Sequence, residues 1–98
     1  MTVLMVRAAV KPESVGELED ALKRMFTAIE RERPTGVRYA SYRLPDGVTY
    51  VVHLEVADGI ENPLTAIAEF REFQAGLRDW LAGPPTAEQF EVRGSYSG

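Results

Sequence analysis

The sequence predicts an α+β fold in which two helices cover one face of a four-stranded antiparallel sheet. Four segments rich in β-branched and aromatic residues alternate their side chains as strands do, and two longer segments repeat apolar residues at helical spacing. The order of these segments along the chain is strand, helix, strand, strand, helix, strand. With 98 residues the chain has the size of one domain with one core, so we assign residues 1–98 to a single domain.

Residues 2–10 predict the first strand, because they are almost continuously apolar and include several valines. Side chains alternate between the two faces of a strand. One face therefore carries Leu4, Val6, Ala8 and Val10, and the other carries Val3, Met5, Arg7 and Ala9.

The first helix is expected to begin between Pro12 and Val15. Proline suits the first helical turn, and Ser14 stands three residues before Glu17, which is the spacing of a capping box. Pro34 ends this helix. Its inner stripe consists of apolar residues at steps of three and four, namely Val15, Leu18, Leu22, Met25 and Ile29.

Residues 37–44 and 48–56 predict an antiparallel hairpin, because they flank the turn sequence Pro45-Asp46-Gly47. Proline presets φ in such a turn, and glycine tolerates a positive φ. In the second strand, alternation gives an apolar face of Val48, Tyr50, Val52, Leu54 and Val56, and a mixed face of Thr49, Val51, His53 and Glu55.

The second helix opens with Asn62 as N-cap and Pro63 as the first helical residue. Its inner stripe contains Ile67, Phe70, Phe73, Leu77 and Leu81, with Trp80 beside them, and Gly83-Pro84-Pro85 ends it. A last strand is expected from about residue 89 to residue 96. The complete order is that of a ferredoxin-like βαββαβ sandwich.

In such a sandwich one face of the sheet has no helices over it. That face is expected to carry apolar and charged side chains together, namely Val3, Met5, Val51, Arg7, His53 and Glu55. It is too apolar to face water and too charged for an ordinary core. The sequence therefore predicts a homodimer in which a second copy of the chain covers this face.

Composition narrows the classes of partner and cofactor. A hydrophobic fraction of 45% with 27% charged residues is typical of a folded globular chain. The net charge of −4 argues against nucleic acid and anionic membranes as partners. The absence of cysteine and the presence of a single histidine argue against a metal cofactor. The N-terminal segment lacks the pattern of a signal peptide, so a cytoplasmic location is expected.

Four features are informative together: residues 70–77, the helix stop Leu81-Ala82-Gly83-Pro84-Pro85, the strand residues Glu91-Val92, and Glu55 near the end of its strand. They resemble the antibiotic biosynthesis monooxygenase (ABM) family of dimeric α/β barrels, which commonly has a glutamate at the position of Glu55. The resemblance covers essentially the whole chain, because the order and length of all six elements agree. It implies a cofactor-free oxygenase that acts on an aromatic or quinol-like small molecule.

Three positions depart from the family pattern. Ala57 stands where a tryptophan is frequent, residues 64–69 contain no histidine, and residues 2–10 lack the asparagine of the haem-degrading members. Haem degradation is therefore disfavoured.

His53 and Glu55 are the candidate catalytic pair. His53 has the only side chain that titrates near neutrality, and Glu55 shares its strand face and could orient it. Such a base could take the proton of a phenol or enol, and the resulting anion would react with dioxygen. Residues two apart on a strand lie about 6.6 Å apart, which does not assure a direct hydrogen bond. The alternative is a structural or interface role.

Arg7 shares that face, where it could form an ion pair with Glu55 or anchor an anionic substrate.

The remaining candidates are aromatic. Tyr39, Tyr42 and Tyr50 could line a pocket for an aromatic ligand, with Phe70, Phe73 and Trp80 as its far wall. The alternative is that these rings fill the core. The two functions left open are a cofactor-independent monooxygenase and a non-catalytic dimer that binds a small ligand or is purely structural. An open cavity between helices and sheet would favour ligand binding, and a filled core would favour the structural role.

Overall fold

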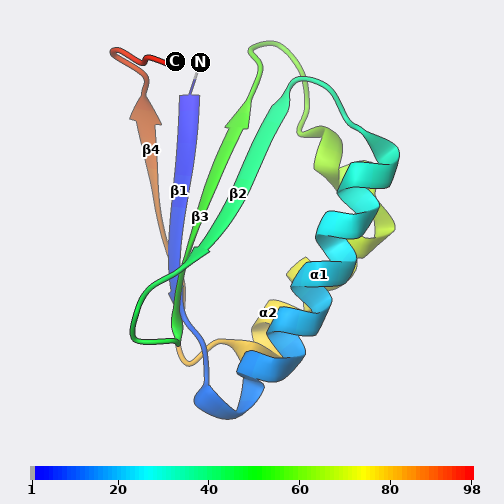
Figure 1. The fold of residues 1–98 in the computed structure, drawn as a ribbon, viewed down its shortest axis with the longest axis vertical. Coiled ribbons are helices and arrows are strands. Elements are labelled where there is room, and N and C mark those ends of the chain that lie inside the picture. Colours follow the sequence, from blue (N-terminus) through cyan, green and yellow to red (C-terminus); the bar gives the residue numbers. More distant parts are fainter. Residues whose placement is uncertain (1) are drawn as a thin grey trace.

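Four antiparallel strands form one sheet, and two helices cover one of its faces (Figure 1). The computed structural model describes residues 2–98. Its strands are β1 (Thr2–Ala9), β2 (Val37–Arg43), β3 (Thr49–Val56) and β4 (Thr86–Glu91). Its helices are α1 (Val15–Glu32) and α2 (Ala68–Trp80), which follow the short 3-10 turns η1 (Pro12–Ser14) and η2 (Pro63–Ala66). The strand order β2-β3-β1-β4 confirms the predicted ferredoxin-like sandwich.

The hairpin of β2 and β3 turns where the sequence predicts it. Asp46 holds the turn, because its carboxylate accepts hydrogen bonds from the backbone N–H of Val48 at 3.0 Å and from that of Thr49 at 2.9 Å. The Thr49 hydroxyl donates a third bond at 2.6 Å. These three bonds lower the pKa of Asp46, and Gly47 adopts the positive φ of 79° that the turn requires.

The helix begins where the sequence predicts it, with η1 from Pro12 and α1 from Val15, but the predicted capping box is absent. Ser14 is the N-cap residue, but its side chain makes no capping hydrogen bond, so the capping box with Glu17 is not formed. The reason is local geometry: η1 runs directly into α1 and leaves Ser14 at φ −101° and ψ −5°, close to helical values. A capping side chain needs an extended backbone at that position.

Two further element boundaries were predicted wrongly. Asn62 caps only the turn η2, accepting the N–H of Leu64 at 3.0 Å, and Ile67 is extended, so α2 begins at Ala68. This break turns both Leu64 and Ile67 into the core. The last strand covers residues 86–91 and not residues 89–96. It pairs antiparallel with β1, with Thr86 opposite Arg7 and Glu91 opposite Thr2, and this long-range pairing is not visible in local alternation.

The core lies between the helices and the sheet. Its buried members are Val10, Leu18, Ala21, Met25, Ala28, Tyr50, Leu64, Ile67, Phe70 and Phe73. The predicted stripe of α1 faces this core: Leu18 and Met25 are buried, and Val15, Leu22 and Ile29 are partly buried against it. Two alanines, Ala21 and Ala28, are also buried. Ala21 lies beside Phe73 and Trp80 of α2, where a small side chain lets the two helices approach closely.

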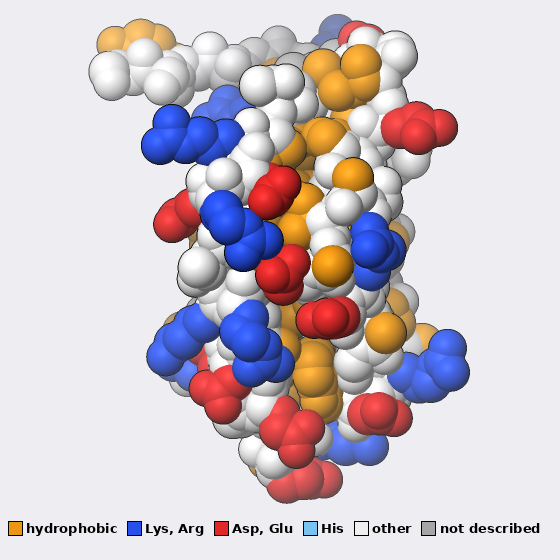
Figure 2. All heavy atoms as spheres, turned by 90° about the vertical axis from the view of Figure 1, so that its right-hand side faces the viewer, with side chains coloured by type: hydrophobic (Ala, Val, Ile, Leu, Met, Phe, Trp, Pro, Cys, Tyr) orange, Lys and Arg blue, Asp and Glu red, His pale blue; other side chains and the backbone are white. Residues whose placement is uncertain are grey.

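The outer face of the helices is covered by side chains of both charges, with hydrophobic side chains visible between them (Figure 2). Arg31 of α1 reaches Glu69 of α2 across this face at 3.3 Å. The sheet-facing sides of the helices are therefore the ones that can form a site for an apolar ligand. In the described part of the chain, neither helix has the length and apolar character needed to cross a membrane.

Gly76 is required for the packing of Trp80 onto α2, and it yields a test of the fold. A Cβ at residue 76 would stand 2.6 Å from Cζ2 and 2.8 Å from Cζ3 of the Trp80 ring. That ring is held by Phe73 and by a hydrogen bond to Glu17, so it cannot move freely. We expect Gly76→Ala to lower the free energy of unfolding by about 1–3 kcal/mol in chemical denaturation.

Gly16 supplies the matched control, because a Cβ there meets nothing within 4 Å. Gly16→Ala should raise the free energy of unfolding by up to about 1 kcal/mol through helix propensity alone. Equal effects of the two substitutions would contradict the packing described here.

Candidate functional site

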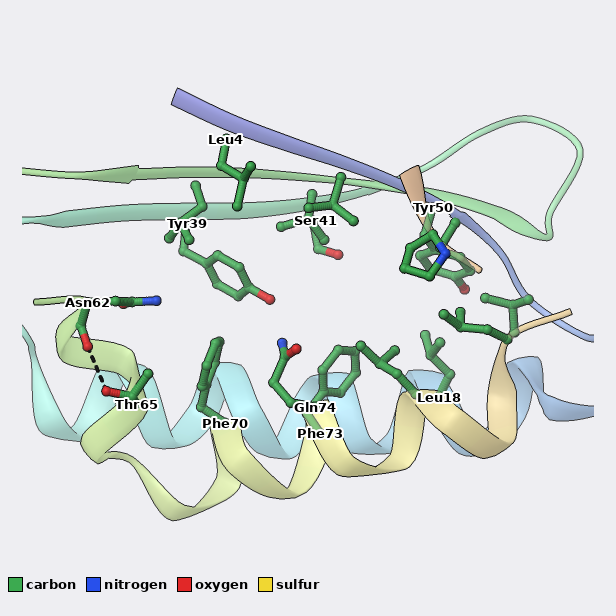
Figure 3. Close-up of a pocket in the computed structure, with 18 residues that line it drawn as sticks. Leu4, Leu18, Tyr39, Ser41, Tyr50, Asn62, Thr65, Phe70, Phe73 and Gln74 are labelled. Atoms are coloured by element: carbon green, nitrogen blue, oxygen red, sulfur yellow. Dashed lines mark hydrogen bonds between the residues drawn. The ribbon is translucent and has the colours of Figure 1, made fainter. Parts of the chain in front are cut away.

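A cavity of about 470 Å³ lies between the helices and the sheet (Figure 3). Aliphatic side chains of the two inner strands, β1 and β3, form one wall together with Tyr39 and Ser41 of β2, and α1 and α2 form the other. Aromatic rings line it from both layers, namely Tyr39, Tyr50, Phe70 and Phe73. The structure thus brings together four of the residues that the sequence predicts to bind a substrate.

Three polar groups point into the middle of this cavity. The hydroxyls of Tyr39 and Ser41 come from β2, and the amide of Gln74 comes from α2 on the opposite side (Figure 3). Within residues 2–98, none of the three side chains has a hydrogen-bond partner. Of the other polar residues of the lining, Thr65 donates to the Asn62 carbonyl at 2.9 Å, and Asn62 caps η2 with its amide oxygen, which leaves only its amide nitrogen without a hydrogen-bond partner in the described chain. The three free groups are therefore available to a ligand.

Tyr39 is fixed in place by its neighbours. Its ring stacks on Phe26 with a centroid distance of 5.5 Å and meets Phe70 edge-on at 5.8 Å. Burial raises the pKa of Tyr39 to about 12, because the phenolate would lose its hydration. At neutral pH the side chain is therefore a neutral, oriented hydrogen-bond donor and acceptor.

Tyr50 lies at the other end of the cavity and ties the sheet to α1. Its ring lines the cavity, and its hydroxyl donates a hydrogen bond to the carboxylate of Glu19. Burial first, and then this bond to Glu19, raises the pKa of Tyr50. Because that hydroxyl already has a partner, Tyr50 contributes its ring rather than its oxygen to the site.

His53, Glu55 and Arg7 lie on the opposite face of the sheet. The register places Met5 opposite His53, Val3 opposite Glu55 and Arg7 opposite Val51, and none of these residues lines the cavity. These three candidate residues are therefore separated by the sheet from the four aromatic ones.

The candidate pair itself is closer than the strand spacing indicates. Nε2 of His53 lies 3.0 Å from Oε1 of Glu55, an ion pair whenever the imidazole is protonated. The spacing of about 6.6 Å describes the backbone positions, and two long side chains bridge it. Within the described residues, no ion pair joins Arg7 to Glu55, and Arg7 is exposed.

Trp80 and Tyr42 also lie away from the cavity. Trp80 packs on Phe73 at a centroid distance of 5.7 Å, and its indole N–H donates to Glu17 at 3.1 Å. It therefore joins the end of α2 to the start of α1 and does not line the cavity. Tyr42 is opposite Val51 on the helix-free face and is 54% exposed.

Ser41 and Gln74 are the site residues that sequence reasoning missed. The signal for both is present in the sequence. Ser41 stands two residues after Tyr39 and so shares its strand face, and Gln74 stands four residues after Phe70 and so shares its helix face. A polar residue on an otherwise apolar inner face is the feature that would have identified them. In the described chain, no three His, Asp or Glu side chains gather closely enough to hold a metal ion.

Comparison with protein-family models finds no match, and comparison with curated proteins finds none either. Solved structures are similar over nearly the whole chain. A provisionally named antibiotic biosynthesis monooxygenase from Nitrosomonas europaea is 18% identical with a TM-score of 0.75, covering 96% of this chain and 100% of its own. The protein Rv0793 from Mycobacterium tuberculosis is 20% identical with a TM-score of 0.76, covering 98% of both chains.

A third similar structure is a variant of SnoaB, described as a cofactor-independent oxygenase from Streptomyces nogalater. It is 18% identical with a TM-score of 0.67, covering 96% of this chain and 94% of its own. At these identities the likeness shows the fold. The chain therefore has the βαββαβ fold of the antibiotic biosynthesis monooxygenases, as its C-terminal motifs predict.

The raised pKa of Tyr39 gives a test of the site. Because its pKa is higher in the folded chain than the usual value of 10.0, the folded state retains a proton that the unfolded state loses. The contribution of protonated Tyr39 to the free energy of unfolding is fully present below pH 10 and is lost as the pH rises toward 12. We expect the free energy of unfolding of the native protein to fall relative to that of Tyr39→Phe over this range by up to about 2 kcal/mol.

Chemical denaturation at several pH values measures this difference. In a spectrophotometric titration, Tyr39→Phe should lose the last tyrosine to ionise before unfolding. If Tyr39→Phe instead lacked a tyrosine that ionises near pH 10, Tyr39 would be exposed to water and not part of a buried site.

Proposed function

We propose that this protein binds an aromatic small molecule in the cavity between its helices and its sheet. The cavity of about 470 Å³ carries the proposal. It has the size and the mainly apolar lining of sites for small ligands, with few polar groups at defined positions. Aromatic rings from β2, β3 and α2 offer flat surfaces against which a planar ligand can pack.

An open cavity favours ligand binding over a purely structural dimer. Packed protein cores contain few voids larger than a water molecule. Here Ala8 and Ser41 present short side chains to the cavity, so the aromatic residues do not fill it. A chain selected only for its packing would be expected to fill that space with larger side chains.

A cofactor-independent monooxygenase reaction in the same cavity is the second candidate function. The observation that favours it is the similarity in fold to a structure described as a cofactor-independent oxygenase. Oxidation of a CH₂ group between aromatic rings to a carbonyl, with release of water, takes all its electrons from the substrate. Such a reaction with dioxygen needs no cofactor. Tyr39 and Gln74 would donate hydrogen bonds to the carbonyl oxygen of the bound substrate and so orient it.

A homodimer that buries the helix-free face of the sheet is the second part of the proposal. Val3, Met5 and Val51 form the apolar centre of this face, and Phe90 is 46% exposed beside Val3. Charges of both signs surround them, namely Arg7, Arg38, His53, Glu55 and Glu88. A twofold axis would bring opposite charges together across the two copies. The two sheets would then form a dimeric α/β barrel.

In this arrangement His53 and Glu55 are interface residues. The sheet separates them from the cavity, so they do not touch a ligand bound there. We propose that their contact of 3.0 Å, together with Arg7, sets the register of the two copies.

The binding proposal is tested with a variant that fills the cavity. A thermal-shift screen of neutral aromatic compounds should find ligands that raise the melting temperature of the native protein. Ala8→Phe places a ring inside the cavity and should weaken binding of these ligands by at least about tenfold. Ala75→Phe, on the exposed side of α2, is the control and should bind as the native protein does.

The binding proposal would be contradicted if Ala8→Phe bound the ligands as tightly as Ala75→Phe does. It would also be contradicted if the screen found no compound that raises the melting temperature. Oxygen consumption with each ligand then separates the oxygenase from a protein that only binds.

The dimer is tested with Val51→Glu. This substitution places a carboxylate at the apolar centre of the helix-free face, and burying it unpaired costs several kcal/mol. Sedimentation should show the native protein as a dimer and Val51→Glu as a monomer or an unfolded chain. His53→Ala should weaken the dimer and leave ligand affinity unchanged.

Ala75→Glu, on the outer face of α2, is the control and should leave the dimer intact. A native protein that sediments as a monomer of 10.9 kDa at micromolar concentration would contradict the proposal.

A further inference from the structure

The polar groups of the cavity have a defined arrangement. Tyr39 and Ser41 approach from the sheet and Gln74 approaches from α2, so their polar atoms face one another across the middle of the cavity (Figure 3). Within residues 2–98 these side chains have no partner in the protein. Among the described residues no unpartnered side-chain polar atom is buried, and Gln74 is exposed, so a ligand oxygen must replace water on these three groups. Their arrangement is therefore informative about the ligand.

We propose that Tyr39, Ser41 and Gln74 form a recognition set that selects an uncharged ligand with a carbonyl or hydroxyl oxygen near the middle of its ring system. This inference rests on the proposed binding of an aromatic molecule in the cavity. Beyond that binding, these three residues determine the affinity, and charged ligands are rejected.

The lining favours an uncharged ligand. None of the described residues that line the cavity has a charged side chain. An anionic ligand would give up its hydration without finding a countercharge, which is costly in an apolar site. The nearby carboxylate of Glu19 is bound to the Tyr50 hydroxyl and would repel an anion further. Arg7, which could neutralise one, lies on the other face of the sheet.

The donors of the set favour an oxygen on the ligand. The phenol of Tyr39 donates one hydrogen bond and stays protonated at neutral pH, since burial raises its pKa to about 12. The amide of Gln74 can donate from the opposite layer, and it can also accept from a ligand hydroxyl. Ser41 can do either. One ligand oxygen near the middle of the cavity can thus be contacted from both the sheet and the helix.

Position along the cavity adds selectivity. The middle carries the polar groups, whereas Leu4 and Phe70 lie toward one end and Leu18 and Tyr50 toward the other (Figure 3). Apolar side chains and rings thus lie on both sides of the middle, with Asn62 and Thr65 at the end beyond Phe70 (Figure 3). A ligand therefore gains most when its rings extend in both directions from a central oxygen.

Three matched probes test the inference: ethylnaphthalene, acetylnaphthalene and naphthoate. The first two are neutral and similar in shape, and only acetylnaphthalene carries a carbonyl. Naphthoate carries an anion at the same position. Isothermal titration calorimetry on the native protein should show acetylnaphthalene binding roughly fivefold or more tightly than ethylnaphthalene. Naphthoate should bind more weakly than either.

Variants assign the preference to residues. Tyr39→Phe keeps the ring contacts with Phe26 and Phe70 and removes only the hydroxyl, and Gln74→Leu removes the amide. Each should reduce the preference for acetylnaphthalene while leaving the affinity for ethylnaphthalene within about twofold of the native value. Tyr42→Phe, on the other face of the sheet, is the control and should keep the full preference.

The outcomes separate this inference from the function on which it rests. Failure of both neutral probes to bind would overturn the binding proposal and the inference with it. Equal binding of the two neutral probes, or binding of naphthoate as tight as that of acetylnaphthalene, would overturn the inference alone. A preference that survives both Tyr39→Phe and Gln74→Leu would also overturn it.

Discussion

An aromatic cluster that spans both layers is the contact on which the site depends. Tyr39 of β2 lies against Phe26 of α1 at 5.5 Å and against Phe70 of α2 at 5.8 Å. Because three rings must fit between the sheet and the helices here, the helices cannot settle onto the short side chains of Ala8 and Ser41. The space that remains is the cavity. At the other end, the bond from Tyr50 to Glu19 holds α1 to the sheet.

The alternation of strand side chains then decides what each face can do. On β2, Tyr39 and Ser41 face the helices, and the neighbouring Tyr42 faces away. On β3, Tyr50 and Val52 face the cavity, and His53 faces away. A single sheet thus separates a mainly apolar cavity from a face that mixes charge with apolar side chains. Ligand binding and dimer formation can therefore use the two faces independently.

Much of the fold could be predicted from the sequence, because periodicity and turn chemistry are local properties. The hairpin at Asp46 and the faces of the strands follow directly from alternation and from turn residues. The bounds of β4 could not be predicted in this way, because they depend on its pairing with β1, which lies far away in the sequence. The extended Ile67 is likewise fixed by burial and not by local preference.

The site was predicted less completely than the fold. Four aromatic residues were placed in the cavity by their spacing, but Trp80 needed the tertiary contact with Glu17 to be located. Ser41 and Gln74 were not predicted, because they carry neither a charge nor a ring, and their importance comes from facing a cavity without a partner in the described chain. Cavity volume depends on how far apart the layers stand, which no local pattern encodes. The cytoplasmic location stays a prediction.

The central claim is that an aromatic ligand binds between the layers and not on the helix-free face. Nuclear Overhauser effects between ligand ring protons and valine methyl groups test it directly, because adjacent residues of β3 lie on opposite faces. We predict contacts to the methyl groups of Val6 and Val52, which line the cavity. Contacts to those of Val3 and Val51, which lie on the helix-free face, would contradict the account.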